Sequence, residues 1–294
     1  MKIHVKYLTI AVLSSLFIVN KAVSQTKHAL FIGISDYGNV KEMPYKWTNI
    51  NGTNDVRLLK PLFEKQGFGT TTLLDSKATY SAIIKEINKL TLKCKKGDYV
   101  YIHFSCHGQP FEDQNGDEAD GWDESIVPVD AGMIYKKGLY EGENHIIDDD
   151  LLVMMNKIRS KVGNTGVIYV VLDACHAGTS FRGDEEDVVR GTNYGFSVEG
   201  KRYRPTRIEK KNHYQMKSTP GYAPIIYLEA CRPYQKNVEI VEQGVNYGGL
   251  SYYISKILSI HTLDRDYKWI YKVDSLMKND IRLSNQNMVI EISL

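Results

Sequence analysis

Residues 167–178 read Val-Ile-Tyr-Val-Val-Leu-Asp-Ala-Cys-His-Ala-Gly. The first six residues form a short, unbroken apolar run rich in β-branched side chains, which is typical of a strand buried on both faces of a parallel sheet. The run stops at Asp173, which is followed by Cys175 and His176. An open α/β sheet places its functional groups at the carboxyl ends of its strands. The stretch therefore predicts Cys175 as a nucleophile, with a buried structural cysteine as the alternative.

A second apolar stretch ends in the same way. Residues 98–108 read Asp-Tyr-Val-Tyr-Ile-His-Phe-Ser-Cys-His-Gly, so a strand over 99–104 would lead to His107 and Gly108. Parallel strands of one sheet finish at the same edge, and a thiol nucleophile needs a nearby base. We therefore predict that His107 activates Cys175, and that the backbone N–H groups of Gly108 and Cys175 stabilise an oxyanion. His103 lies within the strand and is expected to be a core residue.

The remaining pattern indicates one α/β unit. Apolar strand-like runs alternate with helical periodicity, which favours a mainly parallel central sheet with helices on both faces. The chain has 294 residues and a net charge of +2, so composition gives no indication of nucleic-acid binding. Strands are predicted at 28–34, 70–74, 99–104, 167–172, 225–228 and 288–292, and helices from Thr53 or Asn54, from Thr79, at 148–158 and at 250–260.

The N-terminus has the pattern of a secretory signal peptide. Lys2 and Lys6 precede an apolar run over residues 7–19, and Ala-Val-Ser follows at 22–24. This pattern predicts cleavage before Gln25 and a secreted or periplasmic mature chain over 25–294. The apolar run is too short to span a bilayer comfortably, and no other stretch is expected to cross a membrane.

Several motifs together resemble the caspase-like cysteine peptidases. They are the His-Gly pair at 107–108, the run Asp-Gly-Trp-Asp-Glu-Ser-Ile-Val-Pro-Val-Asp at 120–130, and Asp-Ala-Cys-His-Ala-Gly at 173–178. The metacaspases and their bacterial relatives are the branch most similar to this chain, and the resemblance covers most of residues 28–258. It implies a caspase-like fold and a cysteine endopeptidase with a Cys-His dyad, here Cys175 and His107, which acts on proteins or peptides without an organic cofactor.

The substrate pocket is expected to be acidic. Asp173 lies two residues before Cys175, and a buried carboxylate at that place favours a cationic partner. The resemblance implies a pocket for Arg or Lys made by Asp173, Asp55 and Ser105. A helix first-turn acid is an equally weighted alternative for Asp55. Gly52 stands where metacaspases have a cysteine, which leaves the detail of the pocket open.

A calcium site is a weaker expectation. Some metacaspases bind activating calcium through acids that match Asp123 or Glu124 and the pair Asp148 and Asp149. The family has another Asp seven residues after the catalytic cysteine, where this chain has Arg182. Because the Arg182 side chain would repel calcium, the sequence predicts no definite metal site.

The segment 182–220 changes character. It is poor in apolar residues and holds a run of basic side chains, so we predict a mobile linker between a large-subunit-like part (25–181) and a small-subunit-like part (221–294). A peptidase selective for Arg or Lys would cut itself there, and we place processing between Arg190 and Lys217. The basic residues are Lys201, Arg202, Arg204, Arg207, Lys210, Lys211 and Lys217.

Three further hypotheses remain open from the sequence. The four cysteines predict no disulfide framework, but Cys106 could reach Cys175 and form an inactivating bridge. The chain could also be a gingipain- or clostripain-like peptidase, against which the motif at 120–124 speaks, or a non-catalytic homologue that binds peptides. Retention of both His107 and Cys175 argues against the last reading.

Overall fold

The computed structural model describes residues 25–38, 40, 42–116, 118, 120–175, 188–204 and 211–294. The predicted signal peptide (1–24), His176 and Arg182 lie outside these ranges, as do parts of the predicted linker. Within the ranges, no helix is both long and apolar enough to cross a membrane.

The centre of the molecule is a seven-stranded sheet with the order β2-β1-β3-β7-β9-β12-β8. The first five strands in this order are parallel, β12 runs antiparallel to β9, and β8 is parallel to β12. The mainly parallel sheet predicted from the apolar runs is therefore confirmed. The strands are Lys27–Gly33 (β1), Gly69–Leu74 (β2), Tyr99–Ser105 (β3), Val167–Asp173 (β7), His213–Gln215 (β8), Ile225–Glu229 (β9) and Val289–Ser293 (β12).

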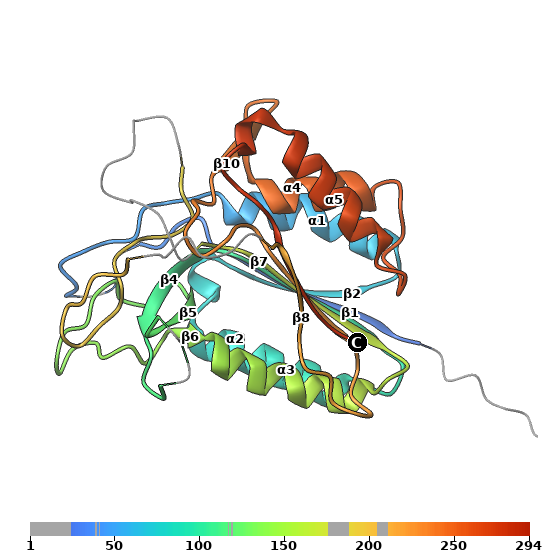
Figure 1. Ribbon diagram of the computed structural model, residues 1–294, viewed down its shortest axis with the longest axis horizontal. Helices are drawn as coiled ribbons and strands as arrows, with labels where there is room; N and C mark the ends of the chain where they lie inside the picture. Colours follow the sequence, from blue (N-terminus) through green and yellow to red (C-terminus); the bar gives the residue numbers. More distant parts are fainter. Residues whose placement is uncertain are drawn as a thin grey trace, which may run out of the picture.

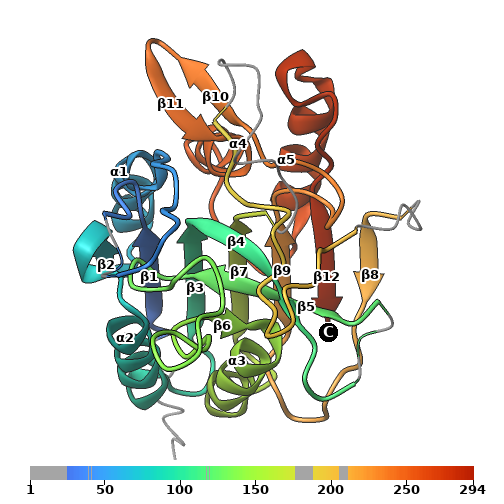
Figure 2. The same cartoon turned by 90° about the vertical axis from the view of Figure 1, so that its left-hand side faces the viewer.

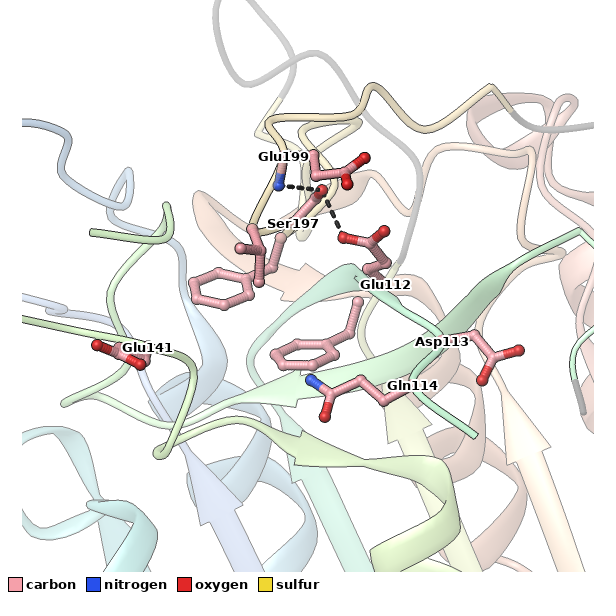
Figure 3. Close-up of a pocket in the computed structure, with 9 residues that line it drawn as sticks. Glu112, Asp113, Gln114, Glu141, Ser197 and Glu199 are labelled. Atoms are coloured by element: carbon pink, nitrogen blue, oxygen red, sulfur yellow. Dashed lines mark hydrogen bonds between the residues drawn. The ribbon is translucent and has the colours of Figure 1, made fainter. Parts of the chain in front are cut away.

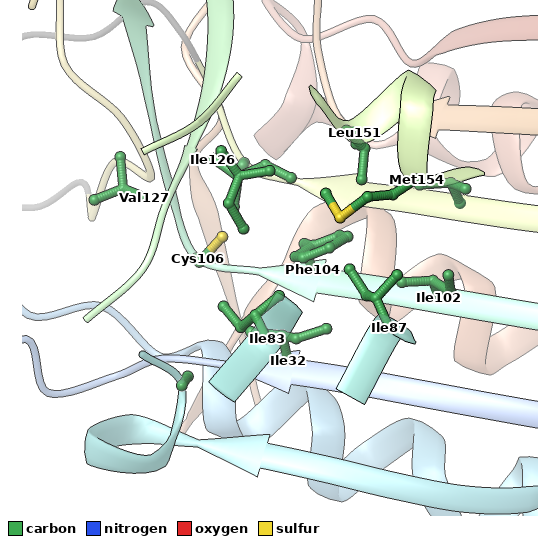
Figure 4. Close-up of a cluster of buried hydrophobic side chains, with 14 of the residues drawn as sticks. Ile32, Ile83, Ile87, Ile102, Phe104, Cys106, Ile126, Val127, Leu151 and Met154 are labelled. Carbon is green, nitrogen blue, oxygen red and sulfur yellow. The ribbon is translucent and has the colours of Figure 1, made fainter. Parts of the chain in front are cut away.

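Helices cover both faces of this sheet, as Figure 1 shows. One layer contains α1 (Gly52–Lys65), α4 (Gly249–Leu258) and α5 (Lys268–Asn279), and the other contains α2 (Tyr80–Lys93) and α3 (Asp148–Val162). Each layer buries its own apolar cluster against the sheet. Figure 4 shows the cluster beneath α2 and α3, where Ile83 and Ile87 of α2 meet Ile102 and Phe104 of β3.

Several elements differ from the sequence-based prediction. The stretch 109–147, for which no strand was predicted, contains most of a small antiparallel sheet made by β4 (His107–Glu112), β5 (Trp122–Val127) and β6 (Ile146–Ile147). Helix α1 has Asn51, not Thr53 or Asn54, as its N-cap residue. The hairpin β10 (Glu239–Glu242) and β11 (Val245–Gly248) and the helix α5 were not predicted. The hairpin contacts α1 and extends beyond the end of the central sheet (Figure 2).

Candidate active site

The two strands that carry the predicted dyad are neighbours. β3 pairs with β7 in parallel register, and Ser105 lies opposite Asp173 at the end of both strands. The chain then continues into His107 and Gly108 on one side and Cys175 on the other. This arrangement follows from the buried apolar runs, because two parallel strands bring their carboxyl ends to one edge.

His107 is held in one orientation. Its Nε2 lies 2.8 Å from the Thr48 carbonyl oxygen, and its ring stacks on Trp47 with centroids 5.0 Å apart. A carbonyl can only accept, so Nε2 carries the proton and Nδ1 has the lone pair. Nδ1 is buried without a hydrogen-bond partner among the described residues. Burial lowers the pKa of His107 to about 4, which keeps the ring neutral and able to accept a proton.

Cys175 is buried next to a second thiol. Its Sγ donates to the Gln235 carbonyl oxygen at 2.8 Å, and the Sγ of Cys231 lies 3.3 Å from it. The hydrogen bond to the Cys175 thiol and burial raise the pKa of Cys231 well above its ordinary value. Cys106 is in a different place: Figure 4 shows it beside Phe104 in the core under α2 and α3. The sulfur neighbour of Cys175 is therefore Cys231, and the structure does not support the hypothesis of a bridge from Cys106 to Cys175.

The backbone of Arg190 lies across this edge of the sheet. The N–H groups of Cys175 and Gly108 both donate to the Arg190 carbonyl oxygen, at 2.9 and 3.4 Å. These are the two N–H groups that the sequence predicted for an oxyanion. The Arg190 N–H donates to the Asn237 carbonyl oxygen at 3.0 Å, so the segment runs antiparallel to residues 237–239 as an added strand.

The side chain of Arg190 fills the predicted acidic pocket. Its Nη1 lies 2.6 Å from Asp55 Oδ2, 2.8 Å from Ser105 Oγ and 3.4 Å from Asp173 Oδ1. Nε and Nη2 donate to Glu239 Oε1 at 3.0 and 2.9 Å. All three residues predicted for substrate binding therefore meet around one guanidinium, and the alternative reading of Asp55 as only a helix first-turn acid does not account for these contacts.

The charges of the pocket are strongly coupled by burial. Desolvation raises the pKa of Asp55 to about 7, although Arg190 opposes the shift. Burial also acts to raise the pKa of Asp173, but Arg190 and the hydrogen bonds from Asn237 and Ser251 hold it below its ordinary value. The neighbouring carboxylates keep Arg190 charged despite its complete burial. The pocket is thus built for a cation, and an unfilled pocket would take up protons more readily.

Downstream of Gly191 the chain continues over the small sheet. The Phe196 N–H donates to the Pro110 carbonyl oxygen at 2.7 Å, and the Phe196 ring stacks on Phe111 with centroids 4.9 Å apart. Ser197 Oγ donates to Glu112 Oε2 at 2.6 Å, as the dashed line in Figure 3 shows. A cavity of about 410 Å³ opens between this segment and the end of β4. Residues 188–197 of the predicted linker are therefore packed against the fold on both sides of Arg190.

The predicted calcium ligands are only partly together. Glu124, Asp148 and Asp149 line one cavity of about 390 Å³, whereas Asp123 lies on the other face of β5. Burial and the nearness of Asp148 raise the pKa of Glu124 to about 8. Among the described residues, however, only His28, Cys94 and Asp98 form a group of three potential metal ligands whose ligand atoms lie close together. This group contains none of the predicted calcium ligands. The cavity gathers acidic side chains, but those described do not form a preformed set of calcium ligands.

Some residues of the site were not found from the sequence. Glu239 and Asn237 come from the C-terminal part of the chain and carry no motif, and Trp47 and Thr48 lie in a loop without regular structure. Arg190 was considered only as one end of the cleavable segment. The sequence feature that could have identified Arg190 is its positive charge in a stretch that otherwise contains mainly acidic and small residues.

Comparisons with known proteins agree with this geometry. The model of the "Caspase domain" family matches residues 26–279. Metacaspase-1 of Pyricularia oryzae is 30% identical over 165 residues, which is 52% of this chain and 37% of that protein. Metacaspase-2 of Arabidopsis thaliana is 36% identical over 102 residues, which is 34% of this chain and 21% of that protein. This chain therefore spans well under half the length of these relatives.

A solved structure extends the likeness over nearly the whole fold. Protein GSU0716 from Geobacter sulfurreducens superposes with a TM-score of 0.59 at 18% sequence identity, covering 91% of this chain and 93% of that one. At this identity the likeness concerns the fold alone. The family match over residues 26–279 covers most of the chain and by itself shows that the chain belongs to the caspase-domain family of cysteine peptidases.

Proposed function

We propose that the protein is a cysteine endopeptidase of metacaspase type that cleaves after Arg or Lys, and that its own Arg190–Gly191 bond is its first substrate. One observation carries the proposal. The Arg190 carbonyl oxygen accepts from the N–H groups of Cys175 and Gly108 while its guanidinium lies among the pocket acids. A substrate with a basic residue before the scissile bond would bind in the same way.

The proposed chemistry uses Cys175 as the nucleophile and His107 as the base. The Cys175 thiol gives its proton to Nδ1 of His107, and the thiolate attacks the Arg190 carbonyl carbon. The N–H groups of Cys175 and Gly108 stabilise the oxyanion. The bond to Gly191 breaks as His107 returns the proton to the Gly191 nitrogen. Water then hydrolyses the thioester, which leaves a carboxylate on Arg190 and a free thiol on Cys175.

The two pieces would remain associated after this cut. β9 belongs to the C-terminal piece and pairs with β7 of the N-terminal piece over Ile168–Leu172, in the middle of the central sheet. Both apolar layers also contain residues from the two pieces. Processing would therefore cut the linker without dissociating the fold.

The test is the mass of the purified protein after incubation. We expect wild type to give a new C-terminus at Arg190 and a new N-terminus at Gly191. The Cys175→Ala and Arg190→Gln variants should not give these termini, whereas Arg202→Gln, at an exposed arginine of the same linker, should behave as wild type. Cleavage of Cys175→Ala at the wild-type rate would contradict the proposal. If wild type gives no new termini and an active-site thiol probe does not label Cys175, a non-catalytic, peptide-binding homologue is favoured.

We also propose export of the protein through the signal peptide predicted over 1–24. The support is the order of basic, apolar and small residues in that segment. Expression of the full chain in a bacterium that secretes proteins should give a mature N-terminus at Gln25 outside the cytoplasm. An intact Met1 in the cytoplasmic fraction would contradict it.

A further inference from the structure

The contacts of Arg190 are not equally distributed over its guanidinium. The Nη1 end meets Asp55, Ser105 and Asp173 at the bottom of the pocket, while the Nε and Nη2 edge meets, among the described residues, only Glu239. An ammonium group offers donors at a single point and lacks this edge. The edge contact therefore distinguishes the two basic side chains that the bottom of the pocket would accept.

Glu239 is itself held in place. Its Oε1 accepts from the Asn51 backbone N–H at 2.7 Å, and its Oε2 accepts from Asn51 Nδ2 at 2.6 Å. Asn51 is the N-cap residue of α1, yet its side chain makes no capping hydrogen bond. The Asn51 side chain binds the Glu239 carboxylate instead of capping the helix. A departure from the usual capping contact is typical of a binding site rather than of a residue that only stabilises the helix.

The residue paired with Glu239 in the hairpin also shapes the pocket. Gly248 lies across the hairpin from Glu239, and its N–H donates to Asp55 Oδ1 at 3.0 Å. A Cβ at this position would lie 2.2 Å from Asp173 Oδ2 and 2.4 Å from Arg190 Nη1. The hairpin therefore provides Gly248, which leaves room for the guanidinium, and Glu239, which is the third carboxylate of the pocket. Neither residue lies in a motif that the sequence analysis identified.

From these contacts we infer that Glu239 is a specificity-determining residue that makes the site select arginine over lysine before the scissile bond. The inference rests on the proposed function, and narrows its substrate class from basic residues to those with a guanidinium. Glu239 binds the edge of the side chain and takes no part in the bond changes at Cys175. Hydrogen bonds to a charged group are worth about 1.5–3 kcal/mol, or roughly 10- to 150-fold in kcat/KM.

The experiment compares matched peptides that end in Arg or Lys before the fluorogenic group. Processed wild type should cleave the Arg peptide at least about 10-fold better in kcat/KM. Glu239→Gln should lose roughly 10-fold or more on Arg and much less on Lys, so that the ratio falls towards one. Glu242→Gln is the control, because Glu242 lies on the same strand and contacts Arg282 instead. Circular dichroism checks the fold of each variant.

A second readout uses the chain as its own substrate. Arg190→Lys should self-process about 10-fold or more slowly than wild type, and this difference should shrink in the Glu239→Gln background. Equal cleavage of Arg and Lys peptides, or equal losses on both in Glu239→Gln, would overturn the inference while leaving the peptidase intact. No cleavage of either peptide by any form would instead overturn the proposed function.

Discussion

Removal of the Arg190 side chain should destabilise the uncleaved protein severely. In a Cys175→Ala background, Arg190→Ala leaves the carboxyl groups of Asp55, Asp173 and Glu239 without their shared cation. Removing one partner of a buried ion pair costs about 3–5 kcal/mol. Alanine also lets water reach the pocket, which reduces the cost, so we expect a loss of about 3 kcal/mol in the free energy of unfolding at pH 8.

The loss should depend on pH in a defined direction. Burial raises the pKa of Asp55 to about 7 even beside Arg190, and loss of the cation would raise it further. At pH 5 Asp55 is protonated with or without Arg190, so Arg190 neutralises one buried charge fewer there than at pH 8. The cost of Arg190→Ala should therefore be smaller at pH 5 than at pH 8.

The assay is urea unfolding followed by tryptophan fluorescence at both pH values. Lys201→Ala is the control, since Lys201 belongs to the same segment and pairs with Glu112 and Glu199 at the surface. An exposed ion pair is worth about 1 kcal/mol or less. If Arg190→Ala costs no more than Lys201→Ala at either pH, the arginine is not held by the pocket in solution, and the reasoning above is wrong.

Three further predictions concern the surroundings of the site. Gly191→Ala should slow self-processing on the order of tenfold, because an added Cβ would lie 2.0 Å from the Cys175 carbonyl oxygen; an unchanged time course on gels would contradict this close approach. Diamide, which accepts two electrons and two protons from a pair of thiols, should join Cys175 to Cys231, whose sulfur atoms lie 3.3 Å apart; peptide mapping without reductant that finds both thiols free would show otherwise. Glu124→Gln should stabilise the fold more at pH 8 than at pH 5. Burial and Asp148 raise the pKa of Glu124 to about 8, so wild-type stability falls as the pH rises from the ordinary glutamate range towards that value; equal melting-temperature shifts at both pH values would refute it.

The sequence was sufficient for the strand-end residues of the site. Val167–Asp173 and Tyr99–Ser105 are continuous apolar runs, so their burial and parallel pairing could be predicted without knowledge of the rest. Once the strands are neighbours, His107, Gly108 and Cys175 must lie at one edge. The resemblance to metacaspases added Asp55 and Ser105, which meet in the structure through a 2.6 Å hydrogen bond.

The rest depends on contacts between distant segments. Glu239 reaches the pocket through a short hairpin with no strong periodicity, and Arg190 pairs with Asp55 across 135 residues. No local propensity encodes such a contact. The hypothesis of a Cys106–Cys175 bridge fails for a related reason: Cys106 lies beside His107 in the sequence, but side chains alternate along the chain, and this one enters the apolar core.

The antiparallel pairing of residues 188–190 with residues 237–239 affects how soon the site can act on other proteins. After the proposed cut, Arg190 becomes a chain end that is still joined to Cys175 through residues 176–189, so it stays on the fragment that carries the nucleophile. A tether of this kind gives its end a local concentration on the order of millimolar. A foreign substrate would have to compete with that departing product for the same pocket. Trimming or unseating of this tail, rather than the first cut, would then set the onset of activity towards other proteins.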